Sequence, residues 1–205
     1  MSKVFQYKLL LILAAAVLFL DQASKYWVSA TLPYGAFFPP QSIEVIPGFF
    51  NIVHVGNTGA AWSLFSDYTW ALTLVGFAAL ILIFVFREAL ELRETRIQFS
   101  FGLIIGGIIG NLIDRVQLGH VVDFLDFHYK DYHFPSFNVA DSGITVGVAF
   151  YIFYSFKSHG TQPPVAEADK GSIPRPDQPE PKPTADQQPV RESSPKSADD
   201  SVPKS

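Results

Sequence analysis

The sequence predicts an all-α membrane protein with four transmembrane helices, a small outer β-sheet and a Pro-rich tail. Three observations predict this: four long apolar runs, basic residues on one side of those runs, and a change of composition near residue 157. Residues 158–205 hold ten of the fifteen prolines and no aromatic residue. We therefore divide the chain into a four-helix domain, residues 1–157, and a disordered tail, residues 158–205.

Four apolar runs approach the roughly 20 residues that a helix needs to cross a bilayer. The predicted spans cover residues 9–28, 68–86, 99–116 and 139–156. The first run also resembles a secretory signal peptide, because Val28-Ser29-Ala30 could serve as a cleavage site. Asp21 and Lys25 interrupt the approach to that site, so we expect the first helix to be retained.

Basic residues orient the four spans. They lie before the first run, between the second and third, and after the fourth: Lys3, Lys8, Arg87, Arg93, Arg96 and Lys157. The positive-inside rule then places both termini in the cytoplasm and the segments 29–67 and 117–138 on the outer side. An even number of spans agrees with basic residues near both ends.

The outer segment between the first two spans contains elements of its own. Residues 43–46 and 50–55 are rich in β-branched side chains and are bounded by Pro and Gly, which predicts two short strands. Residues 60–65 follow as a short surface helix. We expect the strands to form a small cradle on the membrane surface, and residues 117–138 to form a loop.

Ionisable residues within membrane spans are costly and usually serve a function. Here the predicted topology brings five carboxylates to the outer face, together with Asn111, Arg115 and Asn138. The carboxylates are Asp21, Asp114, Asp123, Asp126 and Asp141. The cytoplasmic ends of the spans have no comparable set, so the outer face is the candidate site.

Several of these residues also have a structural interpretation. Asp21 and Lys25 are four residues apart and could form an intrahelical ion pair. Arg115 lies on the outer side against the orienting rule, which predicts an acidic partner such as Asp114. Asn138 could be the N-cap of the fourth helix, with Asp141 in its first turn.

Other residues are expected to have no role in a site. Asp126 and Asp131 flank Lys130 in the predicted loop, and we expect both to be solvated. His120, His128 and His133 share that loop, but their spacing matches no helical H-x-x-x-H pair, so we predict no metal site. A net charge of −4 without a basic patch argues against nucleic acid as a partner.

A stripe of small residues follows the third span at Gly102, Gly106 and Gly110. Small residues every fourth position let a neighbouring helix approach closely. We expect this close packing to hold Asn111 and Asp114 in place.

The chain has no Cys and no G-x-S-x-G or H-E-x-x-H motif, which leaves aspartates as the candidate catalytic groups. Two carboxylates held close together share a proton, so one can activate water while the other protonates a leaving group. The residue pattern alone does not distinguish Asp114 from Asp123 as the partner of Asp141. A proton-relay transporter and a purely structural subunit are the rival functions. A relay needs polar residues across the whole membrane, and here they stop at one face.

Five ordered blocks of sequence resemble the lipoprotein signal peptidase family, also called signal peptidase II, the aspartic peptidase family A8. The resemblance covers about residues 8–157. The blocks are Asp21-Gln22-Ala23-Ser24-Lys25, Asn57-Thr58-Gly59-Ala60-Ala61-Trp62, Gly106–Arg115, Val121-Val122-Asp123-Phe124 and Phe134–Asp141.

The resemblance implies a bacterial inner-membrane enzyme with a periplasmic β-cradle and a periplasmic active site. Its substrate would be a diacylglyceryl-modified prolipoprotein, cut just before the lipidated cysteine, with no cofactor. It implies that Asp123 and Asp141 form the catalytic dyad. The implied supporting and substrate-binding residues are Asp21, Lys25, Asn57, Gly59, Asn111, Asp114, Arg115 and Asn138. We expect membrane lipid around a monomeric chain.

Overall fold

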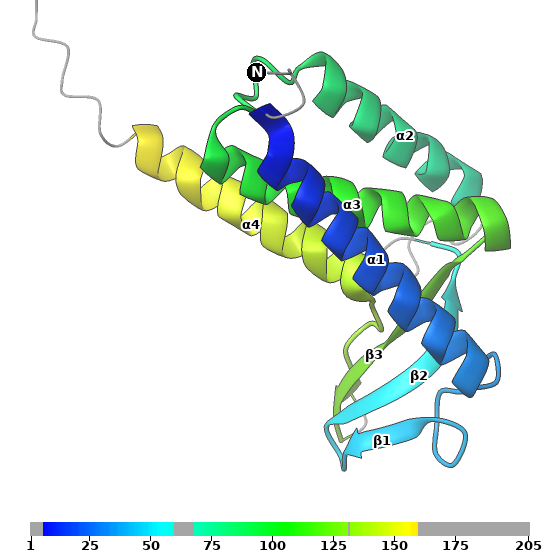
Figure 1. Ribbon diagram of the computed structural model, residues 1–205. Helices are drawn as coiled ribbons and strands as arrows, with labels where there is room; N and C mark the ends of the chain where they lie inside the picture. The colour runs from blue at the N-terminus through cyan, green and yellow to red at the C-terminus, as the bar shows by residue number, and fades with distance from the viewer. Residues whose placement is uncertain (1–5, 60–67, 131, 160–205) are drawn as a thin grey trace, which may run out of the picture. The chain divides into compact units, whose positions relative to one another are not determined.

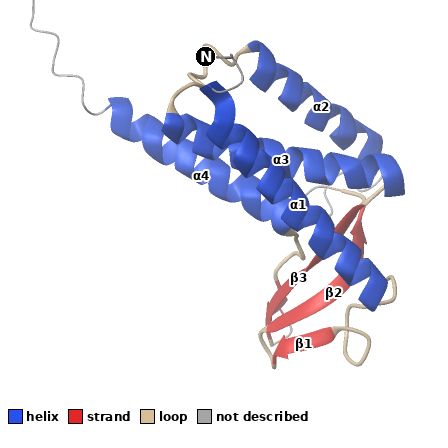
Figure 2. Cartoon of the chain, in the orientation of Figure 1, coloured by secondary structure: helices blue, strands red, loops and turns tan. Residues whose placement is uncertain are grey.

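The structure of this protein, a computed structural model, describes residues 6–59, 68–130 and 132–159 (Figure 1). Its helices are α1 (Lys8–Thr31), α2 (Thr69–Val85), α3 (Thr95–Leu118) and α4 (Val139–His159). Its strands are β1 (Ile43–Ile46), β2 (Phe50–Asn57), β3 (Val121–Tyr129) and β4 (Tyr132–His133). The sheet lies where α1 and α3 end and α4 begins (Figure 2).

Three of the helices, α1, α3 and α4, are long and apolar enough to cross a membrane. The remaining predicted span is α2, which has 17 residues and so lies at the short end of the usual range. Helix α3 begins four residues before its predicted start because Glu94 caps it. The Glu94 side chain accepts a hydrogen bond of 2.9 Å from the backbone N–H of Ile97.

Helix α3 packs against the other three helices, and its glycines set the distances. A Cβ added at Gly106 would lie 2.6 Å from the carbonyl oxygen of Ala14 in α1. At Gly110 it would collide with the carboxylate of Asp21. The predicted small-residue stripe is therefore a helix contact, and it lets a charged residue of α1 lie directly against α3.

The four strands form one antiparallel sheet in the order β1-β2-β3-β4. The two predicted strands, residues 43–46 and 50–55, are confirmed as β1 and β2. The prediction of a loop over residues 117–138 is wrong, because β3 pairs along β2. The first half of β3 is buried on both faces, so its sequence lacks the alternation that marks a half-exposed strand.

A small apolar cluster attaches the sheet to the end of α1. It contains Val28, Leu32, Ala36 and Phe124, all nearly inaccessible to solvent. Because Phe124 follows Asp123 directly, this cluster also fixes the part of β3 that carries a candidate catalytic residue.

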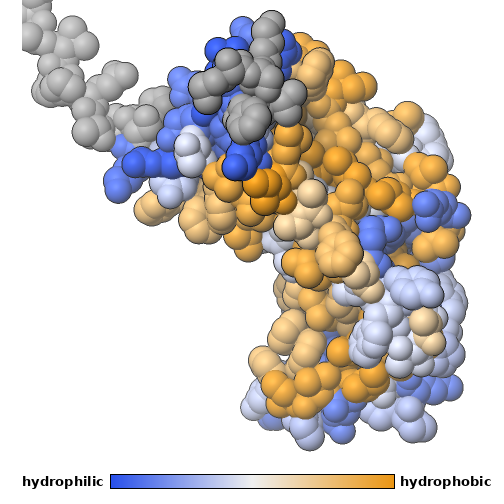
Figure 3. Space-filling model, in the orientation of Figure 1, coloured by the Kyte–Doolittle hydropathy of each residue, from blue (hydrophilic) through white to orange (hydrophobic). Residues whose placement is uncertain are grey.

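Helix α2 is apolar all round and has no buried residue. Its exposed side chains include Trp70, Leu74, Ile81 and Phe84. Such a surface is unfavourable in water and favourable in lipid. Figure 3 shows the same apolar character over the helices on this face, with hydrophilic residues where α1 begins and α4 ends and over part of the sheet region.

Two predictions lie outside the described residues. The expected surface helix at residues 60–65 falls in the undescribed segment 60–67. The expected tail, residues 158–205, falls there from residue 160 onward.

Candidate active site

A buried ionic triad joins α1 to α3. The ammonium nitrogen of Lys25 lies 2.9 Å from Asp21 Oδ2 and 2.8 Å from Asp114 Oδ2. None of the three residues is more than 4% exposed. The predicted ion pair of Asp21 with Lys25 is confirmed, but Asp114 pairs with Lys25, and the prediction that Arg115 would be its partner is wrong.

Asp21 also reaches across to α4. Its Oδ1 accepts a hydrogen bond of 2.9 Å from the backbone N–H of Ala140. Helix α4 begins at Val139, so this N–H is one of the donors that a first helical turn leaves without an intrahelical partner. Because Ala140 directly precedes Asp141, Asp21 fixes the backbone from which Asp141 projects.

Asp114 holds the backbone of β3 in the same way. Its Oδ2 accepts a hydrogen bond of 3.1 Å from the backbone N–H of Val122, the residue before Asp123. Its Oδ1 accepts from the side-chain amide of Gln22 at 3.1 Å. Gln22 was not among the predicted site residues, although it stands next to Asp21 in the first family-like block. Its amide helps to offset the surplus negative charge of the triad.

Asn111 connects the triad to Asp141. Its Oδ1 accepts from Lys25 Nζ at 3.0 Å, and its Nδ2 donates to Asp141 Oδ1 at 2.7 Å. An ammonium group can only donate, so Lys25 requires the amide oxygen of Asn111 to face it. The amide nitrogen must then face Asp141, and the orientation of this side chain is fixed.

Asn138 contacts both candidate catalytic aspartates. Its Nδ2 donates to Asp123 Oδ1 at 2.8 Å, and its Oδ1 accepts from the backbone N–H of Asp141 at 2.9 Å. In return, Asp141 Oδ2 accepts from the backbone N–H of Asn138 at 3.3 Å. This reciprocal arrangement is a capping box. The predicted N-cap is therefore confirmed, and the same side chain also binds Asp123.

Asp123 is held from its other side by the end of β2. Asn57 Nδ2 donates to Asp123 Oδ2 at 2.9 Å, while Asn57 Oδ1 accepts from the backbone N–H of Gly59 at 2.9 Å. Both oxygens of Asp123 thus accept a hydrogen bond from an amide. Neither bond comes from a cation.

The surroundings of Asp123 favour its protonated form. Burial to 2% exposure, followed by the negative charge of Asp141, raises the pKa of Asp123 to about 7. Hydrogen bonds from Asn57 and Asn138 act in the opposite direction but are outweighed. Near neutral pH the two carboxyl groups can therefore hold one proton between them, as acid–base catalysis on a peptide bond requires.

Arg115 faces the same region without an ion pair to any described carboxylate. Its guanidinium donates to the carbonyl oxygen of Gly59 at 3.2 Å, and its Nε is buried with no hydrogen-bond partner in the described part of the chain. A half-buried guanidinium with an unused donor can bind a carbonyl group of a ligand.

Two cavities adjoin these residues. One, of about 560 Å³, has a polar side formed by Asn57, Asn111, Arg115 and Asp141, and an apolar side that includes Phe134, Phe137, Ile144 and Val146. The other, of about 390 Å³, reaches Asp123. A concave apolar surface with a few convergent polar groups is the usual form of a binding site.

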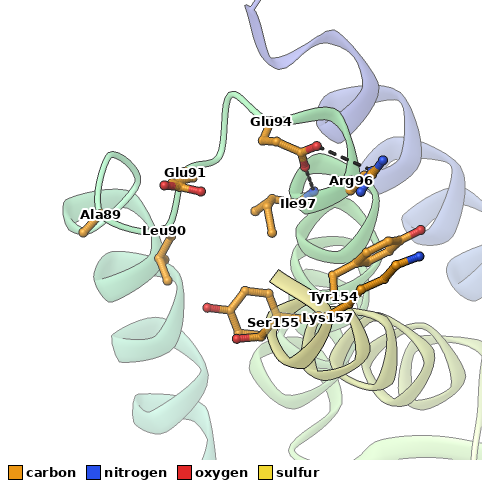
Figure 4. A pocket seen from close by; sticks show the side chains of 10 residues that line it. Ala89, Leu90, Glu91, Glu94, Arg96, Ile97, Tyr154, Ser155 and Lys157 are labelled. Atoms are coloured by element: carbon orange, nitrogen blue, oxygen red, sulfur yellow. Dashed lines mark hydrogen bonds and ion pairs between the residues drawn. The ribbon is translucent and has the colours of Figure 1, made fainter. Parts of the chain in front are cut away.

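A third cavity, of about 520 Å³, lies at the opposite end of α3 (Figure 4). Glu91, Glu94 and Arg96 line it, and the Glu94 carboxylate binds the helix N-terminus. It contains none of the predicted site residues. All ten of those residues lie at the end of the helices that carries the sheet.

The prediction for Asp126 is wrong. We expected a solvated loop residue, but Asp126 is part of β3 and is fully buried. Because residues two apart on a strand share a face, Asp126 and His128 lie together, and β4 brings His133 beside them. The cluster depends on strand pairing, so the sequence spacing of the histidines, which matches no helical pair, does not reveal it. The other residue expected to be solvated, Asp131, is not among the described residues.

Comparison with known proteins identifies the family. The profile of the family described as "Signal peptidase (SPase) II" matches residues 13–157. The lipoprotein signal peptidase of Tolumonas auensis is 44% identical over 149 residues, which cover 70% of this chain and 87% of that protein. The lipoprotein signal peptidase of Geobacter metallireducens has the same identity and coverage.

Solved structures agree with the sequence relatives. A bacterial membrane enzyme structure determined in meso at 2.3 Å resolution is 34% identical, with a TM-score of 0.68, over 76% of this chain and 92% of that one. A second, at 1.9 Å, is 35% identical with a TM-score of 0.61, over 72% of this chain and 92% of that one. With this agreement of sequence and fold, the chain belongs to the signal peptidase II family of membrane proteases that process lipoproteins.

Proposed function

We propose that this protein is an aspartic endopeptidase that cuts diacylglyceryl-modified prolipoproteins just before the lipidated cysteine. Asp123 and Asp141 form its catalytic dyad. The observation that carries this proposal is the position of Asn138, whose one side chain binds Asp123 and the backbone of Asp141. Two carboxyl groups joined in this way and largely buried can share a proton.

In this mechanism water is the nucleophile. The ionised carboxylate of the dyad removes a proton from water as its oxygen attacks the scissile carbonyl carbon. The protonated carboxyl group stabilises the tetrahedral intermediate and then gives its proton to the leaving nitrogen. No acyl-enzyme forms, in keeping with a chain that has no Cys. The dyad titrates as a unit, so neither role is assigned to a single aspartate.

The larger cavity accounts for binding of an extended peptide. Arg115, with its unused Nε donor, can bind a backbone carbonyl oxygen of the substrate. Asn111 and Asn57 hold the dyad while still lining the cavity. The apolar side of the cavity suits the small apolar residues and the acyl chains that flank a lipidated cysteine.

The membrane arrangement is part of the proposal. We take α2 as a fourth span, because a helix of 17 residues without a buried side chain is stable only among lipid tails. Four spans place both termini in the cytoplasm of a bacterial cell and the dyad at the periplasmic face of the inner membrane. The sheet then lies on the outer surface as a cradle over the entering substrate, and the chain acts as a monomer without a cofactor.

The test uses the full chain, purified in detergent, with a diacylated prolipoprotein as substrate. Mass spectrometry should detect a product that begins at the lipidated cysteine. Asp123→Asn and Asp141→Asn should each abolish this product. Glu44→Gln is the matched control, because Glu44 is an exposed carboxylate in the same sheet.

The unlipidated precursor should remain uncut in the same assay. Full cleavage by either dyad variant would remove that residue from the mechanism. Equal cleavage of the unlipidated precursor would contradict the proposed substrate class.

A further inference from the structure

A second cluster of titratable side chains lies in the sheet, on the strand that carries Asp123. Asp126 and His128 are two residues apart in β3, and His133 of β4 is the register partner of His128. The strand period therefore places all three side chains on one face. Their carboxylate and imidazole donor atoms lie within 4.8 Å of one another.

Asp126 is a buried carboxylate without a permanent cation. It is 0% exposed, and its Oδ1 lies 2.9 Å from His133 Nδ1. Among the described residues no Lys or Arg pairs with it; its ionic contacts are with His128 and His133. The amide of Asn51 also donates to Asp126 Oδ2 at 3.5 Å. Buried carboxylates are normally paired with a positive charge or bound to a metal, and the only described groups beside Asp126 that could supply such a charge are the two imidazoles.

His128 supplies an independent observation. Its Nδ1 is buried and has no hydrogen-bond partner in the described part of the chain, although it lies 3.5 Å from Asp126 Oδ2. A buried nitrogen in this state loses its bonds to water and gains none in return. The lone pair of a neutral imidazole is also the commonest metal ligand in proteins.

We propose that Asp126, His128 and His133 bind one divalent cation of the zinc class. Two imidazole nitrogens with one carboxylate oxygen suit Zn²⁺, whereas Mg²⁺ and Ca²⁺ prefer sets of oxygen ligands. The ion provides the missing positive charge beside Asp126 and the missing partner of His128. This proposal replaces the expectation from sequence that the chain has no metal site.

One of the two imidazole rings must turn when the ion binds. They stack with centroids 4.8 Å apart and 17° between their planes. Lone pairs lie in the ring plane, so one ring must turn for both to point at a single ion. His133 is the freer of the two, since its side chain is 25% exposed and that of His128 only 11%.

The position of the cluster indicates a structural role. His133 directly precedes the segment 134–137, which leads to Asn138, and it shares a cavity with Asp123. A bound cation would tie β4 to β3 and so hold that segment against the strand. It would touch no reacting atom, so its effect is to stabilise the cradle.

The experiment measures metal binding directly on the full chain. The protein is purified in detergent with an affinity tag that lacks histidine, treated with a chelator, and titrated with zinc chloride. We expect one zinc ion per chain after gel filtration, and a thermal unfolding midpoint that rises with zinc and not with magnesium. His128→Gln and His133→Gln should each lose both effects.

His120→Gln is the matched control. His120 lies in the same outer region, but its ring packs on Tyr34 with centroids 5.4 Å apart and lies outside the cluster. This variant should bind zinc like the unsubstituted chain.

The proposal is overturned if the unsubstituted chain binds no stoichiometric zinc, as expected if protonated histidines alone compensate Asp126. It is also overturned if both cluster variants still bind zinc. Neither result depends on proteolysis.

Discussion

Asp21 binds the backbone of Ala140, 119 positions away in the chain, at a distance of 2.9 Å. Asp114 binds the backbone of Val122 in the same way at 3.1 Å. Each of these two carboxylates therefore binds the residue that precedes one member of the proposed dyad. Lys25 forms an ion pair with both carboxylates. The relative position of Asp123 and Asp141 is in this way set by α1 and α3 as well as by the elements that carry them.

The first prediction concerns Asp21→Ala, which removes the acceptor of the Ala140 N–H. Displacement of Asp141 should lower kcat by about 10–100-fold, because small errors in position are costly for catalysis. The KM should change little, since Asp21 does not line the substrate cavity. Steady-state kinetics measures both. A raised KM with an unchanged kcat would contradict a positioning role.

The second prediction concerns Lys25→Met. This change leaves Asp21 and Asp114 buried without their ammonium partner, and breaking such a buried pair typically costs about 3–5 kcal/mol. Thermal or chemical unfolding in detergent should show a loss of this size. The double variant Lys25→Met with Asp114→Asn should recover part of the loss, because one uncompensated charge is then removed. No recovery would mean that charge is not the cause.

The third prediction follows from the raised pKa of Asp123. Between its ordinary value of 3.8 and about 7, the folded protein binds more protons at this site than the unfolded chain. The free energy of unfolding contributed by Asp123 must therefore fall as the pH rises through that window, and level off above it. Unfolding at pH 5 and pH 8 measures the change. It should be smaller in Asp123→Asn, and equal changes in the two proteins would contradict the raised pKa.

The fourth prediction tests the contact of α1 with α3. Gly106→Leu places a side chain against the Ala14 carbonyl oxygen, where even a Cβ has no room. Separation of the helices should lower both the unfolding midpoint and the rate of cleavage. The control is Ala78→Leu, which adds the same side chain at an exposed position of α2. Equal effects of the two substitutions would show that packing at Gly106 is unimportant.

The fifth prediction concerns the tail. A chain that ends at Gly160 keeps every residue of the proposed site and the whole matched segment 13–157. The tail has eight acidic and six basic residues after position 160, too even a balance for strong attraction to anionic lipid. Truncation should therefore leave kcat/KM for a diacylated substrate unchanged. A loss of activity in a truncated chain that still inserts and folds would assign the tail a role.

The four helices and the first two strands could be predicted because each is set by local sequence. Apolar runs of membrane length, and β-branched stretches between Pro and Gly, need no partner to be recognised. Only one of the two roles of Asn138 could be predicted from sequence. Its role as N-cap follows from its place directly before Val139, whereas its hydrogen bond to Asp123 depends on how β3 is placed against α4.

The errors share one physical cause, which is strand pairing between distant parts of the chain. Nothing local in residues 121–129 marks β3, because its partner β2 lies before two intervening helices and its first half is buried on both faces. Without β3, Asp126 was read as solvated and the histidines as unrelated. The partner of Asp114 was misread for a similar reason, since Lys25 approaches α3 only through the glycine contact.

The lack of any buried residue in α2 has a consequence for how a substrate would reach the proposed dyad. In the proposed membrane arrangement, moving α2 away from α3 exchanges a protein neighbour for lipid tails of equal polarity, so no hydrophobic free energy is lost. The ionic triad and the cap of α4 lie on other helices and need not change when it moves. In that arrangement α2 can move aside and let a substrate enter from the lipid while the geometry of the proposed dyad is kept.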